Sequence, residues 1–353
     1  MPSTKDLIFT LKNLIFAGGG LRGIAVLGAL QAIRDETGAD FGLRNPKLEN
    51  ICGVSIGCLY ALCLCIGYSV SELTDLCFKL NQNDILEPDP LRIVSAELSV
   101  DSGQKLKKYI EYILQKKNFQ PDLTFKQLYE KTSTSLHVVV TNLSLASVEH
   151  LTKESYPELS IVTAIMASMA LPLVFPPIDS PNGHKWIDGG CYENYPIQKY
   201  NAYESLGIDF GWKLEKSNFD NLPRYLLRII QVMQVPIEIA SWSLLSLEHK
   251  KRTIKIMTGC SSALESALSA REISPETRLN LQRAGFSAAK NLLKNFFKSD
   301  TNIKISDKLS DPGDSLDEET KIVRTLPTYL YSCNFCFPPE NAILGLPDET
   351  WKG

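Results

Sequence analysis

The segment NICGVSIGCLYAL, residues 50–62, constrains the fold of this 353-residue chain more than any other. An apolar run ends in Gly53-Val54-Ser55-Ile56-Gly57, and an apolar, helix-forming run follows directly. A G-x-S-x-G pattern between a strand and a helix is typical of a nucleophile elbow, a sharp turn that exposes the serine hydroxyl at the edge of a sheet. Glycines on both sides allow this turn because they carry no Cβ. We therefore expect Ser55 to be an acyl-accepting nucleophile.

A second glycine-rich turn precedes the elbow and extends the same pattern. Residues 12–17 are predicted to form a short buried strand, Gly18-Gly19-Gly20 follows, and residues 21–37 have helical periodicity. The order strand, loop, helix, strand, elbow and helix predicts an α/β fold with a parallel sheet and right-handed crossovers.

Further elements follow from periodicity and from the positions of proline. A helix is expected from about residue 159, and Pro172 is expected to end it. Residues 300–319 hold seven acidic residues, two lysines and few apolar residues, which predicts a flexible linker. The other expected elements are helices at 69–81, 102–117, from about 159 to Pro172, 222–247 and 274–298, strands at 135–143 and 251–258, and a hairpin partner at 147–152.

Composition excludes several classes of protein. A net charge of −3 offers no electrostatic attraction for nucleic acid, so we expect no nucleic-acid partner. Five of the nine cysteines lie in the apolar region 52–77, which favours packing over a disulfide framework. The start of the chain does not resemble a signal peptide, which predicts a cytoplasmic location. No stretch reaches the roughly 18 uncharged apolar residues of a membrane span, so any membrane contact is expected to be peripheral.

The expected helix at 102–117 carries five lysines beside apolar residues. A solvated helix face explains this pattern, and a surface that contacts anionic lipid headgroups explains it as well. The sequence favours the solvated face and leaves the lipid contact open.

The loop Gly18-Gly19-Gly20-Leu21-Arg22-Gly23 has two interpretations. Consecutive glycines before a helix let backbone N–H groups converge on a negative charge, as an oxyanion requires. The loop also fits G-x-G-x-x-G, the dinucleotide fingerprint, and Asp40 stands 20 residues beyond Gly20, where a ribose-binding acid would lie. The dinucleotide interpretation leaves the elbow unexplained, so we favour the oxyanion loop.

A serine nucleophile needs a base, and none of the histidines at 137, 150, 184 and 249 has the position that a hydrolase triad requires. Only His249 follows Asp188, and a solvated surface position explains it better. Asp188 follows the apolar KWI and precedes two glycines, so a short strand could deliver its carboxylate to a loop. A carboxylate shielded from water can accept the serine proton, although an Asp-Gly pair is also common in hairpin turns.

Four short segments occur in an order that resembles the patatin-like phospholipase family. They are AGGGLRG, GVSIG, ASMALPLVFPP and IDGG, and the resemblance covers about residues 13–200, with a weaker likeness to about 298. The family implies an α/β three-layer sandwich around a mostly parallel central sheet. Residues 1–200 would be its core, 201–298 would complete the same domain, and 299–353 would be an acidic linker and tail.

The resemblance also implies a chemistry. Ser55 would be the nucleophile and Asp188 its base in a dyad without histidine. Gly18, Gly19 and Gly20 would bind the oxyanion, and Arg22 would be the basic residue that follows. The substrate would be a phospholipid or another acyl lipid at a membrane surface, with no metal or other cofactor.

Two alternatives stay open. A lipid-binding or scaffold protein could keep this fold with little chemistry. Cys333 and Cys336 form a lone C-x-x-C pair, and unpaired thiols in the tail explain it better than a metal site.

Overall fold

The computed structural model describes residues 4–80, 82–89, 91–92, 98–211, 222–258 and 274–295. Three sequence predictions lie outside these residues: the linker at 300–319, the tail at 325–353 and the Cys333–Cys336 pair.

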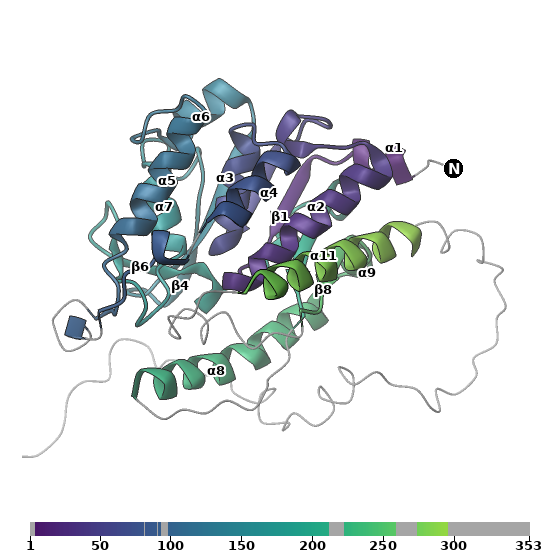
Figure 1. Ribbon diagram of the computed structural model, residues 1–353. Coiled ribbons are helices and arrows are strands. Elements are labelled where there is room, and N and C mark those ends of the chain that lie inside the picture. The colour runs from purple at the N-terminus through teal and green to yellow at the C-terminus, as the bar shows by residue number, and fades with distance from the viewer. Residues whose placement is uncertain are drawn as a thin grey trace, which may run out of the picture. The chain divides into compact units, whose positions relative to one another are not determined.

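One sheet of eight strands organises the described part of the chain (Figure 1). The strands are β1 Asn13–Phe16, β2 Asn50–Val54, β3 Ser135–Asn142, β4 Ser147–Leu151, β5 Ile178–Asp179, β6 Lys185–Asp188, β7 Ser205–Phe210 and β8 Thr253–Ile256. Their order is β5-β6-β3-β2-β1-β7-β8, with β4 paired to β3. The five strands from β3 to β8 are parallel, whereas β4 and β6 run antiparallel to β3, and β5 runs antiparallel to β6. The prediction of a mostly parallel central sheet is confirmed.

Helices connect the strands and flank the sheet, as Figure 1 shows. They are α1 Thr4–Phe9, α2 Ile24–Thr37, α3 Ile56–Cys65, α4 Val70–Lys79, α5 Gln104–Lys116, α6 Phe125–Thr132, α7 Ile161–Ser168, α8 Leu222–Leu244, α9 Leu247–Lys251 and α11 Pro275–Asn295. No described helix is both long enough and apolar enough to cross a membrane.

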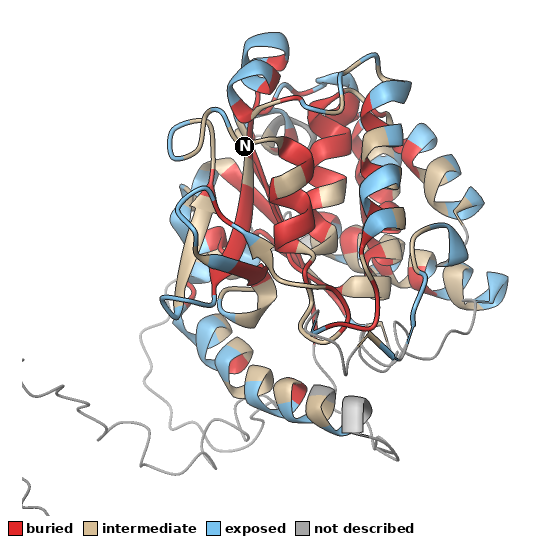
Figure 2. Cartoon of the chain, turned by 90° about the vertical axis from the view of Figure 1, so that its left-hand side faces the viewer, coloured by how far each residue is buried: buried red, intermediate tan, exposed pale blue. Residues whose placement is uncertain are grey.

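The alternation of side chains along β1 divides the core between the two faces of the sheet. Leu14 and Phe16 belong to the large core, which includes residues of α2, α3, α5, α7 and α11. Ile15 points to the opposite face, because successive side chains of a strand alternate, and it belongs to a small core with Val139 and Leu245. Figure 2 shows the buried residues gathered along the sheet and the inner sides of the helices. The fold is therefore a three-layer α/β arrangement.

Several expected elements have different bounds from those that periodicity predicts. The helix expected at 222–247 is two helices, α8 and α9, and the strand expected at 251–258 is only Thr253–Ile256. The helix at 21–37 begins only at Ile24, because Gly20–Gly23 forms a 3-10 turn. The helix before Pro172 ends at Ser168 rather than at the proline. Proline lacks an N–H, its ring clashes with the carbonyl four residues earlier, and it disfavours the helical conformation of the residue before it, so helices commonly end ahead of a proline. Here Met169, with φ −98° and ψ 2°, caps the helix.

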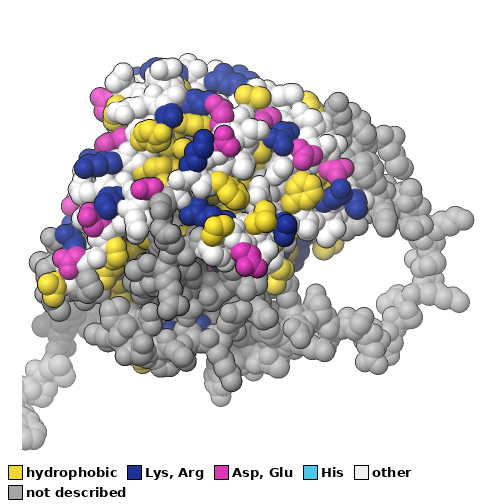
Figure 3. Space-filling view, viewed as in Figure 1, with side chains coloured by type: hydrophobic (Ala, Val, Ile, Leu, Met, Phe, Trp, Pro, Cys, Tyr) yellow, Lys and Arg dark blue, Asp and Glu magenta, His cyan; other side chains and the backbone are white. Residues whose placement is uncertain are grey.

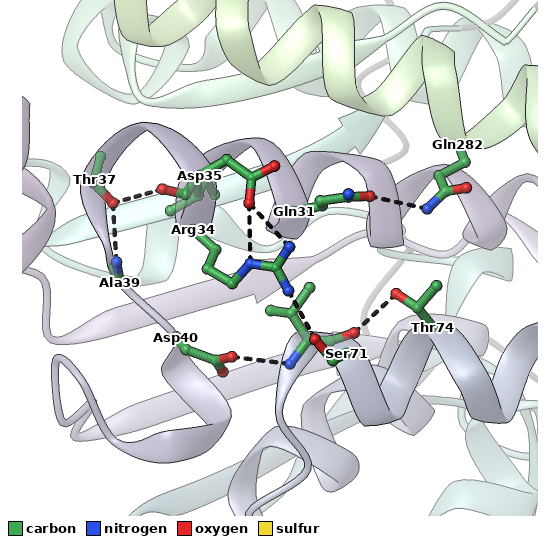
Figure 4. Close-up of polar contacts among 11 residues, drawn as sticks. Gln31, Arg34, Asp35, Thr37, Ala39, Asp40, Ser71, Thr74 and Gln282 are labelled. Atoms are coloured by element: carbon green, nitrogen blue, oxygen red, sulfur yellow. Dashed lines mark hydrogen bonds and ion pairs between the residues drawn. The ribbon is translucent and has the colours of Figure 1, made fainter.

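The helices α2 and α11 pack closely through two glycines. A Cβ on Gly28 would lie 1.8 Å from the carbonyl oxygen of Gln282, and a Cβ on Gly285 would lie 1.8 Å from that of Ala25. Figure 4 shows the two helices side by side, with the Gln282 side chain donating to Gln31 at 3.0 Å. Only glycine permits such a close backbone approach, so α11 is anchored on the helix that follows the glycine loop.

Candidate active site

The elbow has the geometry that its sequence predicts. Ser55 has φ 53° and ψ −127°, a conformation that L-residues rarely adopt, between the end of β2 and the start of α3. A Cβ on Gly53 would lie 2.4 Å from the Cys58 nitrogen, and one on Gly57 would lie 2.7 Å from the Phe16 oxygen. Glycine is required on both sides of Ser55 because the backbone passes so close.

Ser55 and Asp188 are hydrogen-bonded although they lie 133 residues apart in the chain. The Ser55 hydroxyl donates to Asp188 Oδ2 at 2.6 Å. Asp188 ends β6, where it pairs with Val140 of β3, and β3 lies next to the elbow strand β2. The other carboxylate oxygen, Oδ1, accepts the Gly190 N–H at 2.8 Å. The sheet therefore places a carboxylate against the elbow serine and fixes its orientation.

Burial changes the acidity of this carboxylate. Asp188 is only 4% exposed, and loss of hydration raises its pKa to about 6. The hydrogen bonds from Ser55 and Gly190 stabilise the charged form and limit the rise in pKa. A carboxylate with this pKa is ionised near neutral pH and is more basic than an exposed one.

Ser168 supports the elbow from the end of α7. Its hydroxyl accepts the Ser55 backbone N–H at 2.9 Å and donates to the Val139 carbonyl at 2.6 Å. The side chain is fully buried, so both bonds are shielded from water. Ser168 belongs to the segment ASMALPLVFPP that resembles the family, and the structure gives it a direct contact with the elbow.

The glycine loop faces the same pair, and Asn194 joins it to the loop after Asp188. The Gly18 N–H donates to the Asn194 carbonyl at 3.3 Å, and the Asn194 amide donates to the Gly18 carbonyl at 3.2 Å. Gly18, Gly19 and Gly20 were expected to bind the oxyanion together, but the Gly18 N–H already donates to Asn194. Of these three glycines, Gly19 and Gly20 are therefore the ones whose N–H groups could face an oxyanion.

Arg22 connects the loop to the end of β7. Its guanidinium donates to the carbonyl of Gly211 at 3.2 Å and to that of Gly19 at 3.4 Å, and it lies over the Phe210 ring at 5.2 Å. These contacts support the shape of the loop, and Arg22 also lines the pocket in front of Ser55.

Two polar residues of α8 complete the site, and the sequence did not indicate them. Gln234 donates to the Gly190 carbonyl at 3.1 Å, and Glu238 accepts from the Asn194 amide at 3.3 Å. Burial raises the pKa of Glu238 to about 7, and the neighbouring Asp209 carboxylate adds to the rise. Their positions depend on packing between segments 44 residues apart, which leaves no local sequence signal.

A pocket of about 1130 Å³ opens in front of the Ser55–Asp188 pair. One side carries polar groups from Asn194 and α8, whereas the other side is apolar, with Leu106, Val174 and Phe175. An ester with an apolar chain and a more polar alcohol part fits this division.

None of the four histidines lines this pocket or bonds to the pair, and all four lie in the described ranges. Their rings contact other groups: His137 contacts Tyr200, His150 Glu193, His184 Asn142, and His249 the Tyr200 carbonyl. Burial lowers the pKa of His137 to about 4, so that this ring is neutral near pH 7.

Asp40 occupies a structural position rather than a ribose site. Its carboxylate accepts the Val70 N–H at 3.1 Å, where α4 begins, as Figure 4 shows. The helix α2 separates it from the glycine loop, and its 14 residues span about 20 Å. Within the described ranges, no group of three or more His, Cys, Asp or Glu side chains could hold a metal ion.

The lysine-rich helix α5 has acidic neighbours. Lys105 lies 3.6 Å from Glu87, and Lys117, just beyond the helix, lies 2.8 Å from Glu72. Figure 3 shows basic and acidic side chains interspersed on the visible face. This arrangement is typical of a solvated helix face, which was the favoured interpretation.

The model of the patatin-like phospholipase family matches residues 14–199, more than half of the chain. The chain therefore belongs to the patatin-like phospholipase family.

Relatives are viral and bacterial. The chain is 30% identical over 205 residues to the uncharacterized protein R571 of Acanthamoeba polyphaga mimivirus, covering 57% of this chain and 66% of that protein. It is 27% identical over 190 residues to the probable lipid hydrolase 463L of Invertebrate iridescent virus 6, and the match covers 53% of this chain and 62% of that protein. The matches thus span just under two thirds of each relative. The crystal structure of VipD from Legionella pneumophila has the same fold, with a TM-score of 0.51 and 19% identity over 81% of this chain and 67% of VipD.

Proposed function

We propose that this protein is a serine acyl hydrolase that cleaves fatty-acyl esters of membrane lipids, in the manner of a phospholipase A. The observation that carries the proposal is the 2.6 Å hydrogen bond from the Ser55 hydroxyl to the buried carboxylate of Asp188. Family membership and the resemblance to a probable lipid hydrolase support the substrate class.

In the first half of the reaction, Ser55 attacks the ester. Asp188 takes the hydroxyl proton as Oγ bonds to the carbonyl carbon, and a tetrahedral oxyanion forms. Backbone N–H groups of Gly19 and Gly20, together with the start of α3, stabilise this negative charge. When the C–O bond to the alcohol breaks, Asp188 returns the proton to the leaving oxygen.

In the second half, water releases the acyl group. Asp188 takes a proton from the water, which attacks the acyl carbon of the Ser55 ester. The new tetrahedral oxyanion collapses, Ser55 Oγ leaves and takes the proton from Asp188, and a free fatty acid is formed. Since the pKa of Asp188 is raised to about 6, this carboxylate is a better base than an exposed one.

The direct test compares Ser55→Ala and Asp188→Asn with the wild type on mixed lipid vesicles. We expect both variants to fold and to lose at least about a thousand-fold in fatty-acid release. Mass spectrometry of the products identifies the lipid class that is cleaved. Wild-type turnover by Ser55→Ala would show that the assignment is wrong.

A lipid-binding protein without catalysis is the second candidate, and a fluorophosphonate probe separates the two. The probe reacts covalently with an activated serine, so we expect labelling of the wild type and none of Ser55→Ala. A wild-type protein that binds vesicles but neither labels nor releases fatty acid would favour the second candidate.

A further inference from the structure

A second cavity, which we name the α3–α4 slot, opens from the pocket in front of Ser55. The slot and the pocket share four lining residues, Gly20, Leu21, Ile56 and Ile85. Ile56 directly follows Ser55, and Gly20 belongs to the glycine loop. The slot therefore begins where the acyl carbon of an ester on Ser55 would lie.

Residues of α3 and α4 form about half of the lining of the slot, and Ile24, Tyr109 and Arg278 contribute from other helices. From α3 it is lined by residues at helical spacing, Ile56, Leu59, Tyr60 and Cys63, and from α4 by Leu73, Leu76 and Cys77. From Ile56 to Cys63 the helix rises by seven residue steps, or about 10 Å at 1.5 Å per residue. The slot is thus elongated and leads away from Ser55 along α3.

The lining of the slot is apolar. Leu59 and Leu76 are half-buried and pack against the main core, yet they also border this cavity. Among the described lining residues only Arg278 is charged, and its guanidinium donates to the Cys77 carbonyl at 2.9 Å. Burial raises the pKa of Cys77 to about 11, which keeps this thiol neutral. Such a cavity favours an unbranched hydrocarbon chain over water or a polar group.

The main pocket differs from the slot in polarity. Asn194, Gln231, Gln234 and Glu238 give it a polar side, which suits the alcohol part of an ester. A substrate at Ser55 would therefore meet the apolar slot as well as a pocket that has both a polar and an apolar side.

We propose that the α3–α4 slot holds the scissile acyl chain and that its depth sets the preferred chain length. The proposal rests on the proposed function, since the chain enters the slot while it is esterified to Ser55. Leu59 and Leu76 are then specificity-determining residues, because they form facing walls of the slot.

The test narrows the slot with Leu76→Trp and, independently from the other wall, with Leu59→Trp. Hydrolysis of p-nitrophenyl butyrate, octanoate and palmitate gives kcat/KM against chain length. We expect each variant to lose about ten-fold or more on palmitate, while butyrate, which is too short to reach the walls, is cleaved at the wild-type rate. The matched control is Phe78→Trp, on the exposed side of α4 and outside the slot, which should keep the wild-type profile. Variants that fold and retain the wild-type chain-length profile would overturn the proposal.

A binding experiment separates this proposal from the proposed function. In Ser55→Ala, which cannot form the ester, fluorescence of cis-parinaric acid measures binding of a fatty acid alone. We expect Leu76→Trp in this background to weaken binding about ten-fold or more, and Phe78→Trp to leave it unchanged. If the wild type cleaves no ester and Leu76→Trp still weakens binding, the proposed function fails and the slot stands. Equal affinity for cis-parinaric acid in Ser55→Ala, with or without Leu76→Trp or Phe78→Trp, would show that the slot does not hold the acyl chain.

Discussion

Asn194 and Gly18 exchange two hydrogen bonds, one through the Asn194 backbone carbonyl and one through its side-chain amide. The same amide also donates to Glu238 on α8 at 3.3 Å. Asn194 follows the loop of Asp188 closely in the chain, so it ties the glycine loop to the segment that carries the proposed base.

Replacing Asn194 tests whether this tie positions the glycine loop. We expect Asn194→Ala to lower kcat on a long-chain ester by about a hundred-fold, with a smaller change in KM, because a misplaced oxyanion loop acts mainly in the transition state. Steady-state kinetics measure both constants. Asn201→Ala is the matched control, since the Asn201 side chain only accepts the Tyr203 N–H at the surface. An equal loss in both variants would contradict a positioning role for Asn194.

The acidity of Asp188 predicts the pH dependence of turnover. A base must be deprotonated, and the pKa of Asp188 is raised to about 6 by burial. We therefore expect kcat/KM to fall as the pH drops through about 6, and to level off above it. A pH–rate profile on a substrate without ionisable groups measures this. A fall centred near pH 4 would indicate that the base is an exposed carboxylate.

The same pKa shift predicts a cost in stability. The pKa of Asp188 is higher in the folded state, about 6, than its ordinary value of 3.8, so folding is favoured when the carboxyl is protonated. This contribution is complete below about pH 4 and is lost as the pH rises through 6, by about 3 kcal/mol in total. We expect Asp188→Asn, which cannot ionise, to gain stability relative to the wild type between pH 4 and pH 8. Urea unfolding of both proteins at pH 4 and pH 8 measures this gain. If the difference in free energy of unfolding between the variant and the wild type were the same at both pH values, the prediction would be contradicted.

Ser168 offers a test of the support beneath the elbow. Its hydroxyl bonds to the Ser55 N–H and the Val139 carbonyl in a fully buried position. We expect Ser168→Ala to lower the free energy of unfolding by about 1–3 kcal/mol, because both partners lose their hydrogen bond away from water. Ser160→Ala, at the other end of α7, is the control, since the Ser160 side chain makes no capping hydrogen bond. A similar loss in the control would show that the elbow is not the cause.

The contact between α2 and α11 predicts the effect of one methyl group. A Cβ on Gly285 would lie 1.8 Å from the Ala25 carbonyl oxygen, so Gly285→Ala must push the helices apart. We expect the free energy of unfolding to fall by about 1–3 kcal/mol. Chemical denaturation measures it, with the exposed Ser287→Ala on the same helix as the control. A neutral or stabilising Gly285→Ala would show that the helices separate without cost.

Local patterns predicted several elements of the fold and missed others. The elbow strand and helix, the hairpin at 135–151 and the helices α4 and α5 are local, because their periodicity and caps lie within one segment. The central strand β7 was not predicted, because Gly207 and Asp209 interrupt its apolar run and are rare in strands. It forms a strand because it pairs with β1 and β8 on both sides.

The sequence by itself determined the elements whose cause is local: the strained turn at Ser55, which two glycines permit, and the order of motifs that identifies the family. Only the tertiary structure decided which groups meet at that turn. The Asp188 carboxylate reaches Ser55 through the pairing of β6 with β3, and Asn194, in the segment that follows β6, bonds to Gly18. The packing of α8 brings Glu238 to Asn194. The slot likewise depends on where α4, which packs on α2, lies relative to α3. These relationships depend on contacts between distant segments, which a local pattern does not encode.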